Sequence, residues 1–487
     1  MKLQDLLQGI LITDTNLPMD TEITGVSYDS RQVQPGDLFV AVTGFATDGH
    51  KYIPMAREKG ARAVLCETVP EHMDYVQVPS TRQALALVSA NWFLHPARSM
   101  KMIGVTGTNG KTSVTTILKS VLETTLNAKV GLIGTIENKI GQEVIPTERT
   151  TPESYELQKL LRRMADAGCT HVVMEVSSHA LSLYRVAGIE FDVGVFTNLT
   201  EDHLDFHKTM ENYAMAKAQL FAHCKRCVLN ADADFVQMMQ ACATGQVYTY
   251  GIREKADLQA SNVQMESDRV ELDLTWQGET VHAAVGIPGE FTAYNCLSVV
   301  GAGLMLGVPL PALAAALAKA KSVRGRVEVV PTPGTDYTVL IDYAHTPDAL
   351  ENVLKSVRGF CKGRILAVFG CGGDRDPIKR PIMGKIGAEL ADLAIITSDN
   401  PRTEEPGAII DQIVAGAKES GRAYVVVEDR RAAIAWAMAH AKKDDIIVLA
   451  GKGHETYQIL GTKKVHLDER EVVAANLNRE ETGENLQ

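Results

Sequence analysis

The 487-residue sequence has no long run of basic residues and no apolar run of membrane-spanning length, and these absences exclude several kinds of function. With a net charge of −11, the chain is not suited to nucleic acid or an anionic membrane as its main partner. Its first five residues lack the basic and apolar regions of a signal peptide. We therefore expect a cytoplasmic monomer without nucleic-acid binding or membrane insertion.

The cysteines form no paired metal-binding pattern. Cys224 and Cys227 have the C-x-x-C spacing of a zinc or redox motif, but no second Cys or His pair lies nearby at metal-ligand spacing. The pair also runs directly into an apolar segment at 228–229. We therefore expect ordinary buried thiols.

Composition and patterning predict a multidomain α/β protein. The chain is 45% hydrophobic and 22% charged, as globular proteins are, and its length suits two to four domains. Short apolar runs alternate with helix-length segments, without internal repeats. We expect a small N-terminal α/β domain at 1–98, a central P-loop domain with a mainly parallel sheet at 99–331, and a Rossmann-like, doubly wound domain at 332–487.

A glycine-rich turn separates an apolar strand candidate at 102–106 from a helix candidate at 113–126. Backbone N–H groups of such a turn wrap phosphate oxygens, the helix N-terminus adds positive potential, and Lys111 neutralises charge. Val105 stands where the strict P-loop pattern has its first glycine, and an incidental turn with a surface lysine is the alternative. The turn predicts ATP or GTP binding by the following residues: Gly107, Thr108, Asn109, Gly110, Lys111 and Thr112, whose hydroxyl suits Mg²⁺.

Acidic residues and histidines follow two further strand candidates. Glu175 ends an apolar run and either holds Mg²⁺ or is a solvated strand end. The segment 197–207 contains His203, His207 and three acids, so we expect at least one metal ligand there, although histidine is often a satisfied core residue. Lys217, on an amphipathic helix, indicates by itself only a snorkelling side chain.

Four polar turns, at 342–347, 370–376, 398–402 and 451–455, follow strand candidates of the last domain. In a doubly wound fold these turns meet at the carboxyl edge of one sheet, so we expect a second binding site there, although any one turn could be structural. Arg375 and Arg402 opposite Glu455 suit a substrate with both carboxylate and ammonium groups.

Together these segments resemble the Mur ligases of peptidoglycan synthesis, in particular the branch that adds the third amino acid. The resemblance covers essentially the whole chain and implies an ATP-dependent ligase that uses Mg²⁺. ATP would phosphorylate the D-glutamyl carboxylate of UDP-N-acetylmuramoyl-L-alanyl-D-glutamate, and the amine of an amino acid would then attack the acyl phosphate. The matching segments are 29–31, 107–112, 150–152, 175–179, 202–205, 325–328, 342–347, 399–402 and 452–455.

The resemblance also implies roles for single residues. The implied catalytic residues are Lys111, Glu175, His203 and a carbamylated Lys217, and the implied metal ligands are Thr112, Glu175, His203 and Lys217. The implied ATP-binding residues beyond the glycine-rich turn are Ser113, Asn295, Arg326 and Asp342. The implied residues for the UDP-muramoyl dipeptide are Ser30, Thr150, Thr151, Ser177 and Arg185. The implied amino-acid-binding residues are Arg375, Asp399, Asn400, Pro401, Arg402, Gly451 and Glu455.

The tetrapeptide at 399–402 has the form that this branch associates with meso-2,6-diaminopimelate. Arg375 and Arg402 would pair with the distal carboxylate of that amino acid, whereas bound lysine would leave them buried and unpaired. Thr292 and Leu183 depart from the family pattern, where Asn and Gln are common. A lysine- or ornithine-adding relative, a folylpolyglutamate synthase and a slow nucleotide-hydrolysing switch remain alternatives.

Overall fold

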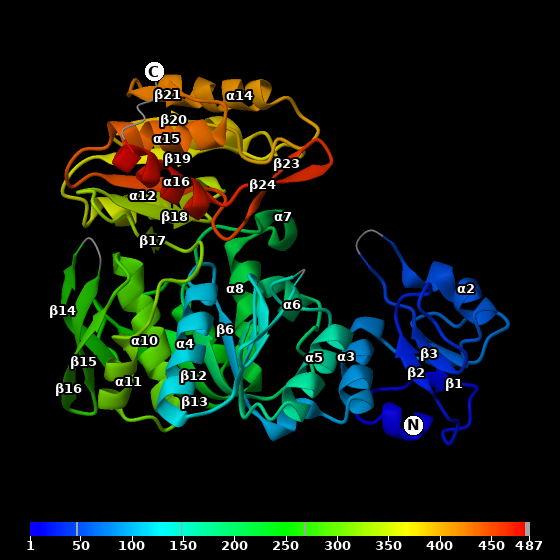
Figure 1. Cartoon of the computed structure of the whole chain (residues 1–487). Coiled ribbons are helices and arrows are strands. Elements are labelled where there is room, and N and C mark those ends of the chain that lie inside the picture. Colours follow the sequence, from blue (N-terminus) through cyan, green and yellow to red (C-terminus); the bar gives the residue numbers. More distant parts are fainter. Residues whose placement is uncertain (45–46, 148, 267–268, 483–487) are drawn as a thin grey trace. The chain divides into compact units, whose positions relative to one another are not determined.

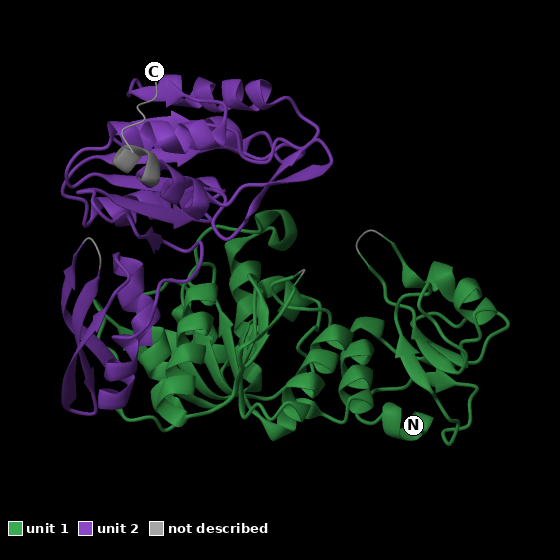
Figure 2. Cartoon of the chain, viewed as in Figure 1, with its two compact units in different colours: residues 1–257, 298–309 green, residues 258–297, 310–487 purple. Residues whose placement is uncertain are grey.

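The computed structural model describes residues 1–482 apart from 45–46, 148 and 267–268 (Figure 1). It forms two compact units, one built from 1–257 and 298–309 and the other from 258–297 and 310–487 (Figure 2). Sheets flanked by helices recur in the N-terminal, central and C-terminal parts, so the predicted three-part α/β fold is confirmed. The boundaries predicted near residues 98 and 331 stay predictions.

The first unit begins with a five-stranded sheet in the order β1-β5-β4-β3-β2. β1 is antiparallel to β5 and the other neighbours are parallel. In β3, Leu38 and Val40 pack into one core cluster and Phe39 into another, so both faces of the sheet are covered. The elements are α1 (Leu3–Leu6), β1 (Asp14–Thr15), β2 (Gly25–Ser27), β3 (Asp37–Val40), α2 (Ile53–Glu58), β4 (Ala63–Cys66), β5 (Tyr75–Gln77) and α3 (Thr81–Trp92).

The central strands of the first unit run in the order β13-β12-β11-β6-β10-β7-β8-β9. They are parallel from β13 to β7, and β8 and β9 add an antiparallel edge. Because β6 lies between β10 and β11 and is parallel to both, the turns that follow these three strands share one edge. The strands are β6 (Lys101–Thr106), β7 (Val130–Ile133), β8 (Asn138–Ile140), β9 (Glu143–Ile145), β10 (His171–Glu175), β11 (Phe191–Phe196), β12 (Cys224–Asn230) and β13 (Gln246–Gly251).

Helices connect these strands, and their apolar faces fill the central core together with the buried strands. The glycine-rich turn leads directly into a 16-residue helix, α4, as the sequence predicted. The helices are α4 (Lys111–Leu126), α5 (Ser154–Asp166), α6 (Ser178–Ser182), α7 (Leu204–His207), α8 (Met210–Ala218) and α9 (Val236–Cys242).

The second unit begins with an antiparallel meander of β14 (Leu258–Met265), β15 (Val270–Trp276) and β16 (Glu279–Val285). Buried residues alternate with half-exposed ones along β15, which confirms the half-exposed strand expected from its alternating sequence. Two helices follow, α10 (Glu290–Met305) and α11 (Leu310–Leu317).

The second unit ends with a six-stranded sheet in the order β17-β18-β22-β19-β20-β21. Only β17 is antiparallel to its neighbour, and two core clusters cover the two faces, as in a doubly wound fold. The strands are β17 (Glu328–Val330), β18 (Thr338–Asp342), β19 (Ile365–Phe369), β20 (Leu393–Ile396), β21 (Tyr424–Val426) and β22 (Ile446–Ala450), with a separate hairpin of β23 (Tyr457–Leu460) and β24 (Lys463–His466). The helices are α12 (Pro347–Arg358), α13 (Lys379–Leu390), α14 (Pro406–Glu419), α15 (Arg430–His440) and α16 (Glu469–Thr482).

Two expectations from the sequence, one on the cysteines and one on membrane-spanning segments, can be compared with this fold. The structure forms no disulfide among the eight cysteines that it describes, and the expected burial of Cys224 and Cys227 is confirmed. No helix within the described residues is long and apolar enough to cross a membrane.

Candidate active site

The glycine-rich turn after β6 is held by the turn after the neighbouring strand β11. The backbone N–H groups of Thr108 and Asn109 donate to the carbonyl and the side-chain oxygen of Asn198, each at 2.9 Å. Gly107 has φ of +148°, and a Cβ atom there would lie 1.9 Å from the Thr197 hydroxyl oxygen, so only glycine fits. This strained glycine makes the turn, whereas Val105 is buried inside β6, which explains the departure from the strict pattern.

Glu175, at the end of β10, is the centre of a buried hydrogen-bond network. Only 1% of the residue is exposed, so a solvated strand end is excluded. Its carboxylate accepts from the Thr112 hydroxyl at 3.1 Å and from the backbone N–H and hydroxyl of Thr135 at 2.8 and 3.0 Å. The structure therefore brings together Thr112 and Glu175, two of the predicted metal ligands.

Four residues predicted to bind the dipeptide substrate lie around Glu175. The hydroxyls of Thr150 and Thr135 lie 3.0 Å apart, and Thr151 donates to the Glu175 carbonyl at 2.8 Å. Thr151 also accepts from the backbone N–H of Ser177, and its carbonyl accepts from Arg185 at 3.1 Å. These predicted residues therefore share one edge of the central sheet.

Lys217 is buried, with 1% of the residue exposed, so the interpretation as a snorkelling side chain is wrong. Its Nζ donates to the Gly107 carbonyl at 2.8 Å and lies 4.4 Å from the centre of the Tyr213 ring. Lys111 donates to the same carbonyl at 2.9 Å. Burial, with the nearby charge of Lys111, lowers the pKa of Lys217 well below its usual value.

His203 belongs to a cluster of aromatic rings beside the glycine-rich turn at 107–112, which is the predicted phosphate loop. Its ring centre lies 4.8 Å from that of His179, and its Nε2 is 3.4 Å from Asp202. His207 contacts the Ser178 hydroxyl at 2.9 Å, and burial together with His179 lowers the pKa of His207 to about 4.

The predicted Mg²⁺ ligands are not all His, Cys, Asp or Glu side chains. Across the described ranges, no group of three or more His, Cys, Asp or Glu residues could hold a metal ion. The predicted set has a different chemistry, because Thr112 offers a hydroxyl and a modified Lys217 would offer a carbamate. Oxygen donors of this kind suit Mg²⁺.

The four predicted turns of the last domain follow β18, β22, β19 and β20, which are consecutive neighbours in the sheet. The Lys452 Nζ donates to Asn400 Oδ1 at 2.8 Å and to Glu455 Oε2 at 2.9 Å, and Asn400 also donates to Glu455 Oε2 at 3.0 Å. The backbone of Gly373 donates to the Asn400 carbonyl at 2.9 Å. The Gly451 N–H donates to the Asp342 carbonyl at 3.0 Å, so all four turns are in direct contact.

The two arginines predicted to read the distal carboxylate both lie close to Gly372. A Cβ atom on Gly372 would be 2.9 Å from Arg402 Nη1 and 3.8 Å from Arg375 Cγ. Arg402 is half-buried and donates to the Gly373 carbonyl at 2.7 Å, but Arg375 is exposed. The expectation that both are buried is therefore wrong for Arg375, which lies in an exposed stretch at 374–378.

The remaining predicted residues have these surroundings. Ser30, in the N-terminal part, contacts the Met55 sulfur at 3.4 Å. Asn295 is buried on α10, as is Thr292, whose hydroxyl donates to the Pro288 carbonyl at 3.1 Å. In the second unit, Arg326 lies 5.2 Å from the centre of the Tyr343 ring, and the Asp342 carboxylate accepts from the backbone N–H groups of Val327 and Ala344. Leu183 is 9% exposed and follows α6.

Several supporting residues escaped prediction from the sequence. Thr135 follows β7 and Glu175 ends the neighbouring strand β10, so the place of Thr135 after a strand was a usable signal. Arg430 and Glu469 form a buried ion pair at 2.8 Å behind the turn after β22, and no local pattern indicated it. Arg380, predicted for no role, is buried and forms two 2.8 Å contacts with Glu404.

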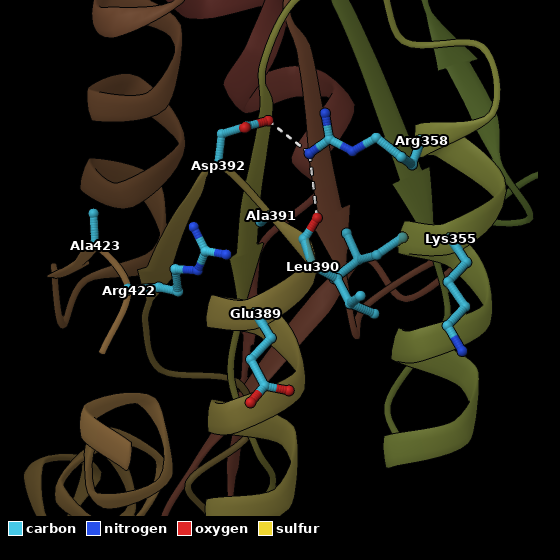
Figure 3. Close-up of a pocket in the computed structure, with 9 residues that line it drawn as sticks. Lys355, Arg358, Glu389, Leu390, Ala391, Asp392, Arg422 and Ala423 are labelled. Carbon is cyan, nitrogen blue, oxygen red and sulfur yellow. Dashed lines mark hydrogen bonds and ion pairs between the residues drawn. The ribbon is translucent and has the colours of Figure 1, made fainter. Parts of the chain in front are cut away.

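A pocket of about 500 Å³ lies at the other end of the C-terminal sheet (Figure 3). Asp392 and Ala423, two of its lining residues, directly precede β20 and β21, so the pocket is at the amino ends of strands whose carboxyl ends carry the predicted site. Arg358 crosses it to donate to Asp392 and to the Leu390 carbonyl. The pocket is therefore separate from the four turns.

Comparison with known proteins agrees with this arrangement. The Mur ligase family catalytic domain matches residues 22–92, the Mur ligase middle domain 105–303 and the Mur ligase glutamate ligase domain 325–453. The chain is 50% identical over 459 residues to the UDP-N-acetylmuramoyl-L-alanyl-D-glutamate--2,6-diaminopimelate ligase of Clostridium botulinum, covering 93% of this chain and 94% of that one. A solved structure of a ligase with this name is 30% identical, covers 99% of both chains and has a TM-score of 0.75.

A more distant structure shares the fold. MurF ligase from Thermotoga maritima, solved in complex with ADP, is 19% identical, covers 95% of this chain and 98% of its own, and has a TM-score of 0.60. The identity and coverage of the nearer relatives leave no ambiguity about descent: this chain belongs to the Mur ligase family.

Proposed function

We propose that this chain is an ATP-dependent ligase that joins meso-2,6-diaminopimelate to UDP-N-acetylmuramoyl-L-alanyl-D-glutamate in the cytoplasm. The observation that carries this proposal is the tetrapeptide at 399–402. It places Arg402 beside Gly372 at the carboxyl edge of the last sheet, in a chain half identical to relatives named for this reaction. The same chain holds a phosphate loop, as a ligase driven by ATP requires.

The reaction consists of two transfers. The γ-phosphoryl group of ATP moves to a carboxylate oxygen of the D-glutamyl residue, which leaves ADP and an acyl phosphate. The amine then attacks the carbonyl carbon, so that a C–N bond forms, the C–O bond to phosphate breaks and the nitrogen loses a proton. Lys111 and the N–H groups of the loop would hold and screen the phosphates, because the enzyme mainly aligns anionic reactants.

Mg²⁺ fits the oxygen donors beside this loop. The Thr112 hydroxyl and the Glu175 carboxylate, 3.1 Å apart, would hold it, with His203 and a carbamylated Lys217 as further ligands. The ion would screen the charge of the phosphates. The low pKa of Lys217 supports carbamylation, because only the unprotonated amine has the lone pair that attacks CO₂.

We assign each substrate to its own group of residues. Thr150, Thr151, Ser177 and Arg185 around Glu175, together with Ser30, would bind the UDP-muramoyl dipeptide. Asn295 would contact the adenine, and Arg326 and Asp342 the ribose and phosphates. At the last sheet, Arg402 and Arg375 would pair with the distal carboxylate of diaminopimelate, and Glu455 with the Gly451 backbone would receive its ammonium.

An amino-acid panel tests the proposal. Purified protein with ATP, Mg²⁺ and the UDP-muramoyl dipeptide should release phosphate rapidly with diaminopimelate and far more slowly with lysine or ornithine. Comparable rates with lysine would contradict the assigned specificity. Phosphate release without any amino acid would favour a nucleotide-hydrolysing switch instead.

A further inference from the structure

A group of buried charges lies in and around the turn at 451–455 that follows β22. Lys452, Arg430 and Glu469 have fully buried side chains, and those of Asp399 and Glu455 are 11% and 15% exposed. Arg430 and Glu469 pair at 2.8 Å and neutralise each other. Arg430 also lies 4.0 Å from Asp399, and Lys452 pairs with Glu455 at 2.9 Å.

Lys452 makes its contacts to residues of the amino-acid site itself. Its Nζ bridges Asn400 Oδ1 and Glu455 Oε2, and Asn400 closes a triangle by donating to the same Glu455 oxygen. Both donors therefore act on Oε2, and the described parts of the chain supply no hydrogen bond to Oε1. The contacts fix the carboxylate so that one oxygen is held and the other is left for a ligand.

The charge of Lys452 also sets what kind of ligand fits. Counted together, the cations Lys452 and Arg430 and the carboxylates of Asp399, Glu455 and Glu469 carry one net negative charge, which one ammonium group balances. Without Lys452, the remaining groups would carry two net negative charges against one ammonium, and a buried carboxylate without its partner is strongly unfavourable. Burial of a lysine side chain itself costs free energy, so a buried lysine in this polar turn needs a reason beyond packing.

We propose that Lys452 is a positioning residue for the incoming amino acid: it orients Glu455 and Asn400 and leaves one carboxylate oxygen for the amino acid's ammonium group. This inference rests on the proposed function, in which Glu455 receives that ammonium. It assigns Lys452 a role through Glu455, not contact with the reacting atoms.

The test is a double-mutant cycle between Lys452→Met and Glu455→Gln. Lys452→Met keeps the length of the side chain and removes its charge and donors, and Lys443→Met, at an exposed lysine before β22, is the matched control. Steady-state phosphate release gives kcat and the KM for diaminopimelate, ATP and the dipeptide. We expect Lys452→Met to raise the KM for diaminopimelate by about 10- to 100-fold, as loss of a hydrogen bond to a charged group does, with little change in the KM for ATP.

The second arm of the cycle separates positioning from general stability. In the Glu455→Gln background, Lys452→Met should raise the KM for diaminopimelate less than about threefold, because its target carboxylate is already gone. Equal factors in both backgrounds, or an equal rise in the KM for ATP, would overturn the inference. If Glu455→Gln alone leaves the KM for diaminopimelate unchanged, the proposed role of Glu455 fails instead.

Failure of the Lys452 variants to fold would also decide the question. Lys452→Gln keeps a donor at this position, and we expect it to fold and to show a smaller rise in the KM for diaminopimelate than Lys452→Met. If both Lys452 variants fail to fold while Glu455→Gln folds normally by circular dichroism, Lys452 serves the fold and the inference is wrong.

Discussion

The position of Lys217 predicts that its amine is carried as a carbamate. Its Nζ and that of Lys111 donate to the same Gly107 carbonyl at 2.8 and 2.9 Å, so the two nitrogens are at most the sum of these distances apart, about 5.7 Å. Two positive charges at that separation repel by ~3 kcal/mol when the effective dielectric constant is about 20. A carbamate would turn this repulsion into an attraction of similar size.

We expect Lys217→Met to lower kcat by about 100-fold, because ~3 kcal/mol corresponds to about two powers of ten in rate. Phosphate release with saturating substrates measures this loss. Added formate or acetate should restore part of the activity, since a short carboxylate can take the place of the carbamate. Lys159→Met, at an exposed lysine on α5, is the matched control and should behave as the unmodified chain does.

Lys217→Met should lower activity but should not lower the stability of the folded chain. Because the pKa of Lys217 is lower in the folded chain, the folded state binds fewer protons than the unfolded state, and the contribution of this group to stability rises with pH between the two pKa values. At neutral pH the buried amine therefore costs stability, and Lys217→Met should keep or raise the unfolding temperature. Full activity of Lys217→Met, or an active protein whose native mass lacks one CO₂, would refute the reasoning.

Three further predictions address other parts of the site. Gly107→Ala should abolish nucleotide binding, measured by calorimetry, because its Cβ would collide with Thr197; retained binding would contradict the fixed loop. Arg402→Ala should raise the KM for diaminopimelate at least about 10-fold while the KM for ATP stays constant, and equal rises would count against its role. Arg380 and the Asp374 N–H lower the pKa of Glu404 from 4.5 to about 2, so its stabilisation is complete above pH 4.5 and is lost as pH falls towards 2. Glu404→Gln should flatten that part of the acid-unfolding curve, and an unchanged curve would exclude this pair as its cause.

Strand positions and the turns after them were predictable because buried parallel strands have a strong local signal. The run at 365–369 is apolar throughout and flanked by polar turns, and β19 has those bounds. Once the strands are placed, parallel pairing brings their carboxyl ends to one edge, so Glu175 and the phosphate loop had to lie close together.

Burial of single side chains was not predictable, because it depends on segments distant in the chain. Lys217 has the local sequence of an ordinary surface lysine, yet Gly107, 110 residues away, accepts its hydrogen bond. Lys452 and Asn400 are 52 residues apart and meet only because β22 and β20 flank β19. Arg375 likewise lies in an exposed stretch at 374–378, and composition does not encode that exposure.

The backbone at Arg402 connects the proposed amino-acid site to a segment outside the tetrapeptide. Its φ is +53°, a left-handed conformation that costs about 1 kcal/mol or more for a residue other than glycine. The hairpin strand β23 offsets this cost, because the Arg402 N–H donates to Ile459 at 3.1 Å and the Arg402 carbonyl accepts from Gly461 at 2.8 Å. The backbone of Arg402 is thus held by hairpin contacts as well as by its own sequence. Changing the tetrapeptide alone would therefore not transfer the specificity of one Mur ligase to another, because the hairpin that fixes Arg402 would have to change with it.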